Sequence, residues 1–459
     1  MSSHRPVRVA VIGAGPAGIY ASDILSRSGL DVSIDLIERL PAPFGLVRYG
    51  VAPDHPRIKQ IITALHKVLE RGDIRLICNV DYGVDLKLED VRRHYDAVIF
   101  ATGAIKDADL PIPGIDLDGS YGAADFVSWY DGHPDVPRSW PLDDREVAVI
   151  GAGNVALDVA RMLAKHAEDL AATDVPANVH QVLAASPITD VHVFARRGPA
   201  QAKFSSLELR ELGHVRDVDV IVYPEDFEFD EGSQAAIRSS NQTKQVVKTL
   251  TDWTLKEPEE LTASRRIHLH FLHAPAEVLG EDGKVVGLRT ERTVLTGDGT
   301  VVGTGQFHDW PVQAVYRAVG YFGSPVVDVP FDEQGGVIAN REGRVVDVDG
   351  DPVPGVYTTG WIKRGPVGLI GHTKSDAKET IEHLVEDAAA ESFRAATEPD
   401  PEAVLDFLRA RGARPIHWDG WELLDAYERT LGEREGRERV KVVPREDMVR
   451  IALALTDED

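Results

Sequence analysis

Residues 8–20, Arg-Val-Ala-Val-Ile-Gly-Ala-Gly-Pro-Ala-Gly-Ile-Tyr, predict a strand, a glycine turn and a helix in direct succession. The apolar run over residues 9–12 is typical of a buried parallel strand. In a dinucleotide-binding turn, the first glycine permits the tight turn, the second admits a pyrophosphate to the backbone, and the third lets helix and strand pack closely. Gly13, Gly15 and Gly18 have that spacing. The helix N-terminus would add N–H donors and a partial positive charge for the phosphates.

A second strand is expected over residues 33–37, and it ends at Glu38. A carboxylate at this place suits the 2′-hydroxyl of an adenosine ribose. The first stretch therefore predicts a dinucleotide site at the start of a doubly wound α/β domain.

The glycine turn recurs at residues 151–156, between an expected strand over 146–150 and an expected helix over 157–165. Alanine in the third small position still permits close packing of helix and strand. The next strand, expected over 191–195, ends in Arg196 and Arg197 instead of an acid. Two guanidinium groups there favour the 2′-phosphate of NADP. The alternative is a solvated arginine pair on a loop.

Composition limits the classes of protein that fit. A chain of 459 residues with 43% hydrophobic residues is expected to form two or three domains. The net charge of −25 disfavours nucleic-acid binding. The single cysteine, Cys78, excludes a disulfide framework, a C-x-x-C redox pair and a cysteine-ligated cluster. We expect a cytoplasmic protein without a signal peptide or membrane span, because the first strand begins near Met1 and no apolar run approaches about 18 residues.

The rest of the chain predicts how the domains alternate. Residues 40–60 look like an irregular, unusually apolar loop, and a Pro-rich segment at 111–114 marks the crossing into a second domain. Residues 267–318 predict a small antiparallel meander, and a strand within 309–320 is expected to return the chain to the first domain. A third glycine-rich strand-to-helix turn follows at 355–372, where a helix N-terminus could stabilise an anionic reduced flavin. From residue 377 we expect helices with no evident chemistry.

Several longer motifs make the pattern specific. They are Phe-Gly-Leu-Val-Arg at 44–48, Val-Ala-Pro-Asp-His-Pro at 51–56, Gly-Asn-Val-Ala-Leu-Asp-Val-Ala-Arg at 153–161, Arg-Arg-Gly-Pro at 196–199, Leu-Glu-Leu-Arg-Glu-Leu at 207–212 and Trp-Ile-Lys-Arg-Gly-Pro at 361–366. With them the chain resembles the adrenodoxin-reductase type of ferredoxin–NADP reductase, including its actinobacterial members, from about residue 7 to residue 451.

That resemblance implies two Rossmann-like dinucleotide-binding domains and a helical C-terminal extension. The FAD-binding domain would comprise residues 1–104 and 321–459, and the NADP-binding domain residues 105–320. The enzyme would pass a hydride from NADPH to FAD and then single electrons to a small acidic iron–sulfur ferredoxin, which feeds acceptors such as cytochrome monooxygenases.

The resemblance also implies site residues. FAD would be held by Gly13, Gly15, Ala17, Gly18, Glu38, Leu46, Tyr82, Trp361, Gly368, Leu369 and Ile370. NADP would be held by Ala152, Gly153, Asn154, Val155, Arg196, Arg197, Glu208 and the backbone at Gly368. Tyr82 and the run Gly371-His372-Thr373 depart from the family pattern, which affects packing near the adenine and polar detail beside the flavin.

His55 and Glu211 match a pair that the family uses to handle a proton or to position the nicotinamide. His55 lies in a Pro-Asp-His-Pro turn, where a structural histidine is the commoner finding. Histidine titrates near neutral pH and is a common proton carrier, so both readings stay open.

Local charge favours an acidic partner. Residues 192–216 carry five Lys/Arg against two Glu, and residues 361–378 carry four Lys/Arg against one Asp, a net of +3 in each. Such patches on an acidic body would steer a small acidic protein, although part of this charge would bind NADP. A flavin disulfide reductase is disfavoured because there is no C-x-x-C. An amidotransferase-partner oxidoreductase, a monooxygenase and a non-enzymatic NADP sensor remain alternatives.

Overall fold

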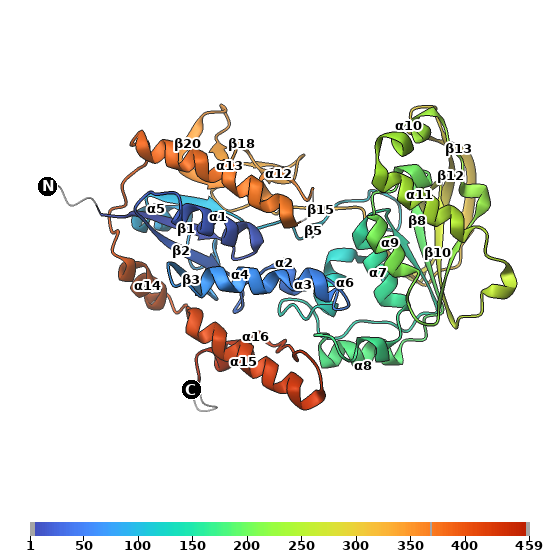
Figure 1. Cartoon of the computed structure of the whole chain (residues 1–459), viewed down its shortest axis with the longest axis horizontal. Coiled ribbons are helices and arrows are strands. Elements are labelled where there is room, and N and C mark those ends of the chain that lie inside the picture. Colours follow the sequence, from blue (N-terminus) through green and yellow to red (C-terminus); the bar gives the residue numbers. More distant parts are fainter. Residues whose placement is uncertain (1–4, 368–369, 456–459) are drawn as a thin grey trace. The chain divides into compact units, whose positions relative to one another are not determined.

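The computed structural model describes residues 5–367 and 370–455 and contains two compact units (Figure 1). The first unit comprises the chain up to Lys106, the short segment Asp131–Asp135 and everything from Tyr321 onward. The second comprises Asp107–Tyr130 and Val136–Gly320. Among the described residues, no helix is long and apolar enough to cross a membrane.

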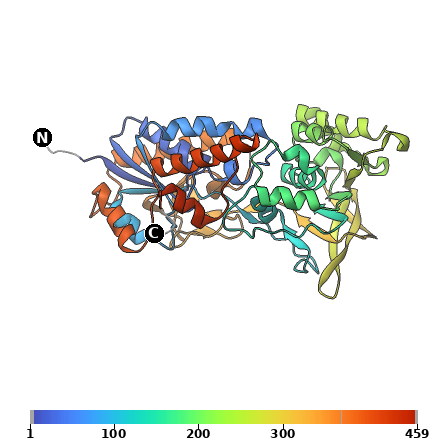
Figure 2. The same ribbon diagram turned by 90° about the horizontal axis from the view of Figure 1, so that it is seen from below.

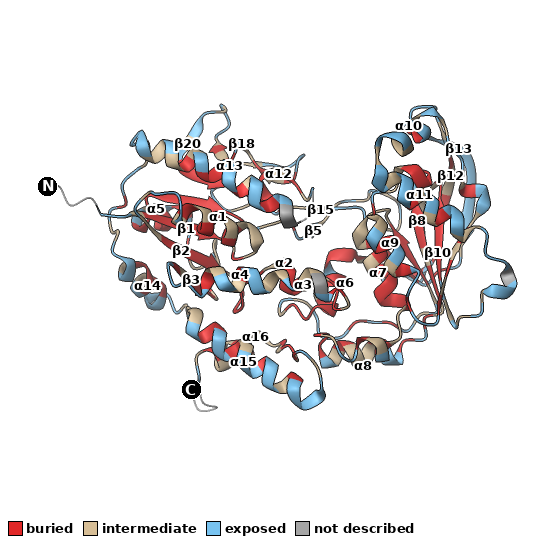
Figure 3. Ribbon diagram, viewed as in Figure 1, coloured by how far each residue is buried: buried red, intermediate tan, exposed pale blue. Residues whose placement is uncertain are grey.

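A seven-stranded sheet forms the centre of the first unit, in the order β18-β19-β20-β4-β1-β2-β3. Its parallel strands are β1 (Val7–Ile12), β2 (Val32–Glu38), β3 (Ile74–Cys78), β4 (Ala97–Phe100) and β20 (Pro352–Thr358). The antiparallel edge is made by β18 (Asn340–Arg341) and β19 (Arg344–Val346). Short strands β16 (Phe331–Asp332) and β17 (Val337–Ile338) pair separately. The central strands are buried on both faces, as parallel strands are when helices cover the sheet (Figure 3).

Helices cover both faces of this sheet. One face, with Val9, Val11 and Leu36, packs against α1 (Pro16–Ser26), α4 (Ile61–Leu69) and α13 (Ile370–Ala389). The other face, with Ala10, Ile12 and Ile37, packs against α5 (Leu88–His94) and α14 (Pro401–Ala410). The alternation of these residues along β1 and β2 follows the two-residue period of a strand.

The C-terminal extension adds α15 (Trp418–Glu435) and α16 (Arg445–Ala452) to the first unit. Ile416 forms a two-way backbone bridge with Cys78, which covers the outer edge of β3. The Trp418 ring then meets the His66 ring of α4 at 4.7 Å between centroids. Figure 2 shows these red helices alongside the blue N-terminal elements of the unit.

The second unit contains an all-parallel sheet in the order β6-β14-β7-β8-β10-β9. Its strands are β6 (Ser120–Gly122), β7 (Glu146–Ile150), β8 (Asp190–Ala195), β9 (Val218–Val222), β10 (Arg265–Phe271) and β14 (Ala314–Arg317). Its helices are α6 (Ala123–Tyr130), α7 (Asn154–Ala164), α8 (Ala177–Ala185), α9 (Ser206–Leu212), α10 (Glu231–Ser239) and α11 (Asn241–Trp253). An antiparallel meander of β11 (His273–Glu281), β12 (Lys284–Leu295) and β13 (Val301–Trp310) completes the unit.

The α/β fold class, with two parallel sheets and a helical C-terminal part, is confirmed. Two local predictions were wrong. Residues 267–271 belong to the parallel strand β10, not to the meander. The segment 40–60 contains two one-turn helices, α2 (Leu46–Tyr49) and α3 (Pro56–Lys59). For the polar region over residues 221–265 the sequence made no prediction; it contains α10 and α11, whose N-termini are capped by the side chains of Asp230 and Ser240.

Two candidate dinucleotide sites

The turn after β1 fits a pyrophosphate. Gly13 has φ +108°, and a Cβ on it would lie 2.5 Å from the Ala101 carbonyl oxygen. A Cβ on Gly18 would lie 1.9 Å from the Gly13 carbonyl oxygen, so α1 needs glycine there to pack against the turn. A Cβ on Gly15, by contrast, would meet no atom closer than the Gly45 Cα at 3.9 Å. The fold itself requires the outer two glycines, whereas the middle one keeps open the place where a phosphate would contact the backbone.

Glu38 holds this turn in shape. Its Oε2 accepts a hydrogen bond from the Ala14 N–H at 2.8 Å, and its Oε1 accepts one from the Leu40 N–H at 3.0 Å. Burial raises the pKa of the carboxyl group, although the two N–H donors act in the opposite direction. Each carboxylate oxygen can accept a further hydrogen bond, so the group can also accept one from a ribose hydroxyl.

The apolar segment 40–50 folds directly over the turn. The Phe44 N–H donates to the Ala14 carbonyl oxygen at 2.8 Å. Gly45, with φ +49°, lies so close that a Cβ on it would be 3.0 Å from the Gly15 Cα. Helix α2 begins at the next residue, Leu46, which is half-buried. This segment therefore forms one wall of the candidate FAD site.

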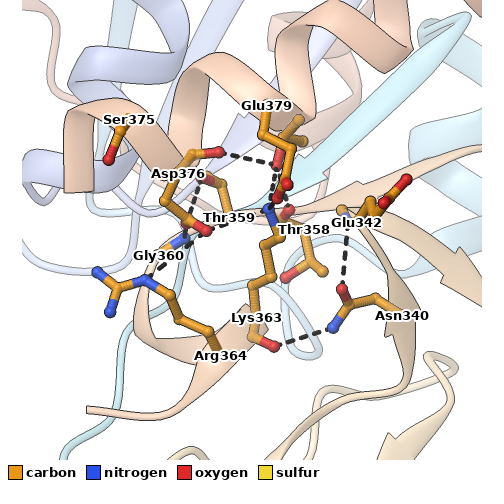
Figure 4. Close-up of polar contacts among 12 residues, drawn as sticks. Asn340, Glu342, Thr358, Thr359, Gly360, Lys363, Arg364, Ser375, Asp376 and Glu379 are labelled. Carbon is orange, nitrogen blue, oxygen red and sulfur yellow. Dashed lines mark hydrogen bonds and ion pairs between the residues drawn. The ribbon is translucent and has the colours of Figure 1, made fainter. Parts of the chain in front are cut away.

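A second wall comes from the turn between β20 and α12 (Trp361–Arg364), shown in Figure 4. Gly360 lies against the start of α1, because a Cβ on it would be 2.6 Å from the Ala17 Cβ. Asp376 of α13 accepts hydrogen bonds from the Gly360 N–H at 2.5 Å and the Thr359 hydroxyl at 3.1 Å. These contacts fix the backbone that carries Trp361.

Lys363 lies buried in the same cluster. Its ammonium group is 3.1 Å from Asp376 and 2.5 Å from Glu379, and it donates to the Thr380 hydroxyl at 3.2 Å (Figure 4). Lys363 is therefore not part of an exposed positive patch. The charge count over 361–378 missed this because Glu379 lies one residue beyond it.

Of the remaining predicted FAD residues, the structure describes the side chain of Tyr82 only. The Tyr82 hydroxyl donates to the Val327 carbonyl oxygen at 2.9 Å, and its ring meets the edge of Phe100 at 5.0 Å between centroids. Gly368 and Leu369 lie outside the described residues. Ile370 begins α13, but its side chain is not described.

The turn after β7 in the second unit repeats the same steric pattern. A Cβ on Gly151 would lie 2.2 Å from the Ala318 carbonyl oxygen, whereas a Cβ on Gly153 would meet nothing within 4 Å. The segment before α9 braces the turn: the Lys203 N–H donates to the Ala152 carbonyl oxygen at 2.8 Å, and the Ser205 N–H donates to Asn154 Oδ1 at 2.7 Å. Asn154 and Val155 open α7. The residues present thus fit a second pyrophosphate.

Arg196 and Arg197 follow β8 on a fixed backbone. The Thr293 hydroxyl donates to the Arg196 carbonyl oxygen at 2.8 Å, and the Leu272 N–H donates to that of Arg197 at 3.2 Å. Arg196 is exposed and Arg197 is half-buried. Within the described ranges, neither guanidinium group forms a hydrogen bond or ion pair with the protein. Two unpaired cations on a rigid strand end are suited to a phosphate group.

Helix α9 carries Glu208 and Glu211. Glu208 is buried, its N–H is capped by the Ser205 hydroxyl, and its Oε2 lies 3.7 Å from Arg161 Nη1. Glu211 is half-buried one turn later. His55 directly precedes α3 in the first unit, makes no side-chain capping hydrogen bond to that helix, and is 5% exposed. Because His55 and Glu211 lie in different units, their pairing stays a prediction.

A histidine cluster on the second sheet is a feature that sequence reasoning missed. His192 of β8 faces His268 across the strand pair, and His270 lies two residues along β10 on the same face. His192 Nδ1 lies 3.0 Å from His270 Nε2, and the three rings stack within 14° of parallel, beneath Trp310. The 3.0 Å contact between the two ring nitrogens is a hydrogen bond, in which one neutral imidazole donates and the other accepts.

This cluster predicts that acid destabilises the protein. Burial lowers the pKa of His192 to about 3 and that of neighbouring His273 to about 4, and it also lowers the pKa of His268 and His270. In the unfolded chain these groups bind protons near pH 6.5, so below about that pH unfolding takes up protons. Each histidine should then lower the free energy of unfolding by up to about 1.4 kcal/mol per pH unit.

Urea unfolding between neutral and mildly acidic pH measures this slope. In His192→Phe the free energy of unfolding should change less steeply with pH, by an amount that corresponds to about one proton fewer taken up on unfolding, whatever the effect on absolute stability. A free energy of unfolding that is independent of pH in this window would show that the histidines are not held neutral.

Comparisons with known proteins agree with this geometry. Residues 7–202 match the family described as pyridine nucleotide-disulphide oxidoreductase. NADPH-ferredoxin reductase FprA of Mycobacterium tuberculosis is 39% identical over 98% of this chain and 100% of its own length. The mitochondrial NADPH:adrenodoxin oxidoreductase of Arabidopsis thaliana is 37% identical over 98% of this chain and 96% of its own length.

A solved structure of Mycobacterium tuberculosis FprA in complex with NADPH superposes with a TM-score of 0.91 at 38% identity, covering 98% of this chain and 100% of that one. Nearly the whole length of both chains is therefore shared in sequence and in fold. The resemblance carried by the motifs is confirmed: the chain belongs to the family of NADPH-ferredoxin and adrenodoxin reductases, oxidoreductases whose cofactors are FAD and NADP(H).

Proposed function

We propose that this enzyme passes electrons from NADPH through FAD to a small acidic iron–sulfur ferredoxin. The observation that carries the proposal is that the two glycine turns, after β1 and after β7, are similar in shape but are followed by residues of opposite charge. The first site has the Glu38 carboxylate at its end, which suits a ribose. The second has the guanidinium groups of Arg196 and Arg197, which have no partner among the described residues and suit a 2′-phosphate. The first unit is then the FAD unit, and the second the NADP unit.

Bound FAD supplies the chemistry, because it can accept a hydride and release single electrons. The chain's own residues bind and orient. In the FAD unit, Gly15 and the N-terminus of α1 would hold the pyrophosphate, and Glu38 the ribose. Ala17, Leu46 and Trp361 would line the walls, Tyr82 would lie near the adenine, and Gly368, Leu369 and Ile370 would lie beside the flavin.

In the NADP unit, the turn Ala152–Val155 and the N-terminus of α7 would hold the pyrophosphate. The arginine pair would clamp the 2′-phosphate, with Glu208 lining the site. Exposed Arg196, Lys203 and Arg210 would also attract an acidic ferredoxin, and because such attraction is screened by salt, the rate of ferredoxin reduction should fall as ionic strength rises. A rate that does not respond to salt would contradict the charge argument.

The proposal requires bound FAD. The purified protein should be yellow and release FAD on denaturation, because the Glu38 carboxylate and the Gly15 gap are suited to an adenine dinucleotide. Chromatography of the released flavin measures this. Release of FMN, or a colourless protein that cannot be loaded with FAD, would contradict the proposal.

His55 and Glu211 are proposed to hold or move a proton, or to position the nicotinamide. His55→Ala should slow reduction of the flavin by NADPH while FAD content and NADP affinity stay close to wild type. Glu211→Ala should act in the same step, and the double variant should lose less than the two single losses combined, as for groups that work as a unit. Stopped-flow rates for the four proteins decide this. An unchanged rate in His55→Ala would mean that the residue only shapes the Pro-rich turn before α3.

A further inference from the structure

The C-terminal extension contacts the wall of the FAD cradle repeatedly, although its sequence indicated no chemistry. Trp421, Leu424, Glu428 and Gly432 lie on one buried face of α15, at the spacing of a helix stripe. Glu428 is the charged member of that stripe and is fully buried. A buried carboxylate is costly unless it is paired and hydrogen-bonded, so its partners matter.

Glu428 pairs with Arg48, 380 residues earlier in the chain. Its Oε1 accepts from Arg48 Nη2 at 2.6 Å and from the Val442 N–H at 2.9 Å, and its Oε2 accepts from Arg439 Nη1 at 3.2 Å. The Arg48 guanidinium also lies over the Trp421 ring at 5.3 Å. The opposing carboxylate raises the pKa of Arg48, which stays charged. This is a buried ion pair between α15 and α2, in which Glu428 is the carboxylate that pairs with Arg48, while Arg48 Nε has no hydrogen-bond partner among the described residues.

The segment that Arg48 anchors is strained. Phe44 has φ +84°, in the left-handed region that residues with a Cβ rarely adopt, and it is followed by Gly45 at φ +49°. Such backbone persists only where the surroundings enforce it. Phe44 is held edge-on by Trp421 at 5.6 Å between ring centroids, and Lys441 donates to the Arg48 carbonyl oxygen at 2.9 Å. The strained residues are those that donate to Ala14 and lie against Gly15.

We propose that Glu428 is a positioning residue of the FAD site. Through Arg48 it keeps residues 44–46 in their strained conformation over the Gly13–Gly18 turn, so that the C-terminal extension determines how tightly FAD is retained. This inference rests on the proposed binding of FAD at that turn. It assigns a role to a helix whose sequence indicated no chemistry.

The test is the rate of FAD release from the loaded holoenzyme, followed by the rise in flavin fluorescence. Glu428→Gln should raise that rate by at least about tenfold, because removing one partner leaves Arg48 buried without its counter-charge. Asp425→Asn is the matched control. Asp425 lies on α15 like Glu428 and also pairs with Arg439, at 2.8 Å, but it makes no hydrogen bond or ion pair with Arg48 among the described residues. Its rate of FAD release should stay within about twofold of wild type, whatever the change in thermal stability.

A double-mutant comparison separates positioning from general destabilisation. In an Arg48→Met background, Glu428→Gln should add little to the rate of FAD release, because the contact to the segment is already lost. If Glu428→Gln does not fold, Arg48→Met alone carries the same test, since Glu428 keeps Arg439 as its partner.

Two failures are distinguishable. Equal FAD release from Glu428→Gln and Asp425→Asn, or full additivity with Arg48→Met, would overturn the role of Glu428. A wild-type protein that neither retains FAD nor oxidises NADPH would instead overturn the proposed function.

Discussion

Replacing both Arg196 and Arg197 by Gln is expected to weaken NADPH binding strongly while leaving NADH binding nearly unchanged. Each guanidinium group would lose a charge-assisted contact to phosphate worth roughly 1.5–3 kcal/mol. Each loss corresponds to about a tenfold to hundredfold change in the NADPH dissociation constant. Because neither guanidinium group pairs with described protein atoms, the substitutions break no hydrogen bond or ion pair among the described residues, and the fold should be retained. Titration of both nucleotides against the oxidised enzyme measures the effect.

Arg216→Gln provides the control for net charge. Arg216 is exposed, lies in the same positive segment and pairs with Asp169 at 3.0 Å. It should change the affinity for NADPH only slightly. If NADH binding suffers as much as NADPH binding in the double variant, the arginine pair is structural, and the choice of NADP rests on family membership alone.

The second large effect is expected at the first glycine turn, where two alanine substitutions should fail in different ways. Gly15→Ala should fold, since its Cβ meets nothing closer than 3.9 Å, yet it should lose FAD affinity because the methyl group intrudes where the pyrophosphate would lie. Loss of one N–H contact to phosphate would weaken binding by about tenfold or more. Gly18→Ala should destabilise the whole unit, since its Cβ would lie 1.9 Å from the Gly13 carbonyl oxygen.

Thermal unfolding of the FAD-free proteins, together with the FAD dissociation constants, separates the two defects. The FAD-free Gly15→Ala protein should unfold close to the wild-type temperature. Normal FAD affinity in Gly15→Ala would contradict the placement of the pyrophosphate at this turn.

Local sequence predicted the nucleotide cradles because their chemistry is local. The glycine spacing, within six residues, predicted each turn. The residues at the end of the next expected strand, Glu38 in one unit and the Arg196–Arg197 pair in the other, predicted which nucleotide each site would hold. The prediction that residues 267–271 belong to the meander failed because of their pattern. Ile267 and Leu269 alternate with His268 and His270, which is typical of a strand with one exposed face. Both histidines are in fact buried.

The supports of the candidate FAD site could not be predicted, since their partners are distant in sequence. The sequence around Lys363 does not indicate that Asp376 and Glu379 form ion pairs with it. The Arg48–Glu428 pair joins an apolar loop to a helix near the end of the chain. The one available signal was that Arg48 is a charged residue within an apolar run, and this signal does not indicate which residue pairs with it. Helices α10 and α11 were missed because they bury few apolar side chains, such as Val246 and Leu250 of α11.

The most direct test of the central claim is a single anaerobic experiment with the FAD-loaded enzyme, NADPH and an acidic iron–sulfur ferredoxin. We expect NADPH to bleach the flavin absorption rapidly, and the ferredoxin to become reduced as the flavin absorption returns, with NADH much less effective. A flavin that NADPH does not bleach, or a bleached flavin that gives no electrons to any ferredoxin offered, would contradict the account.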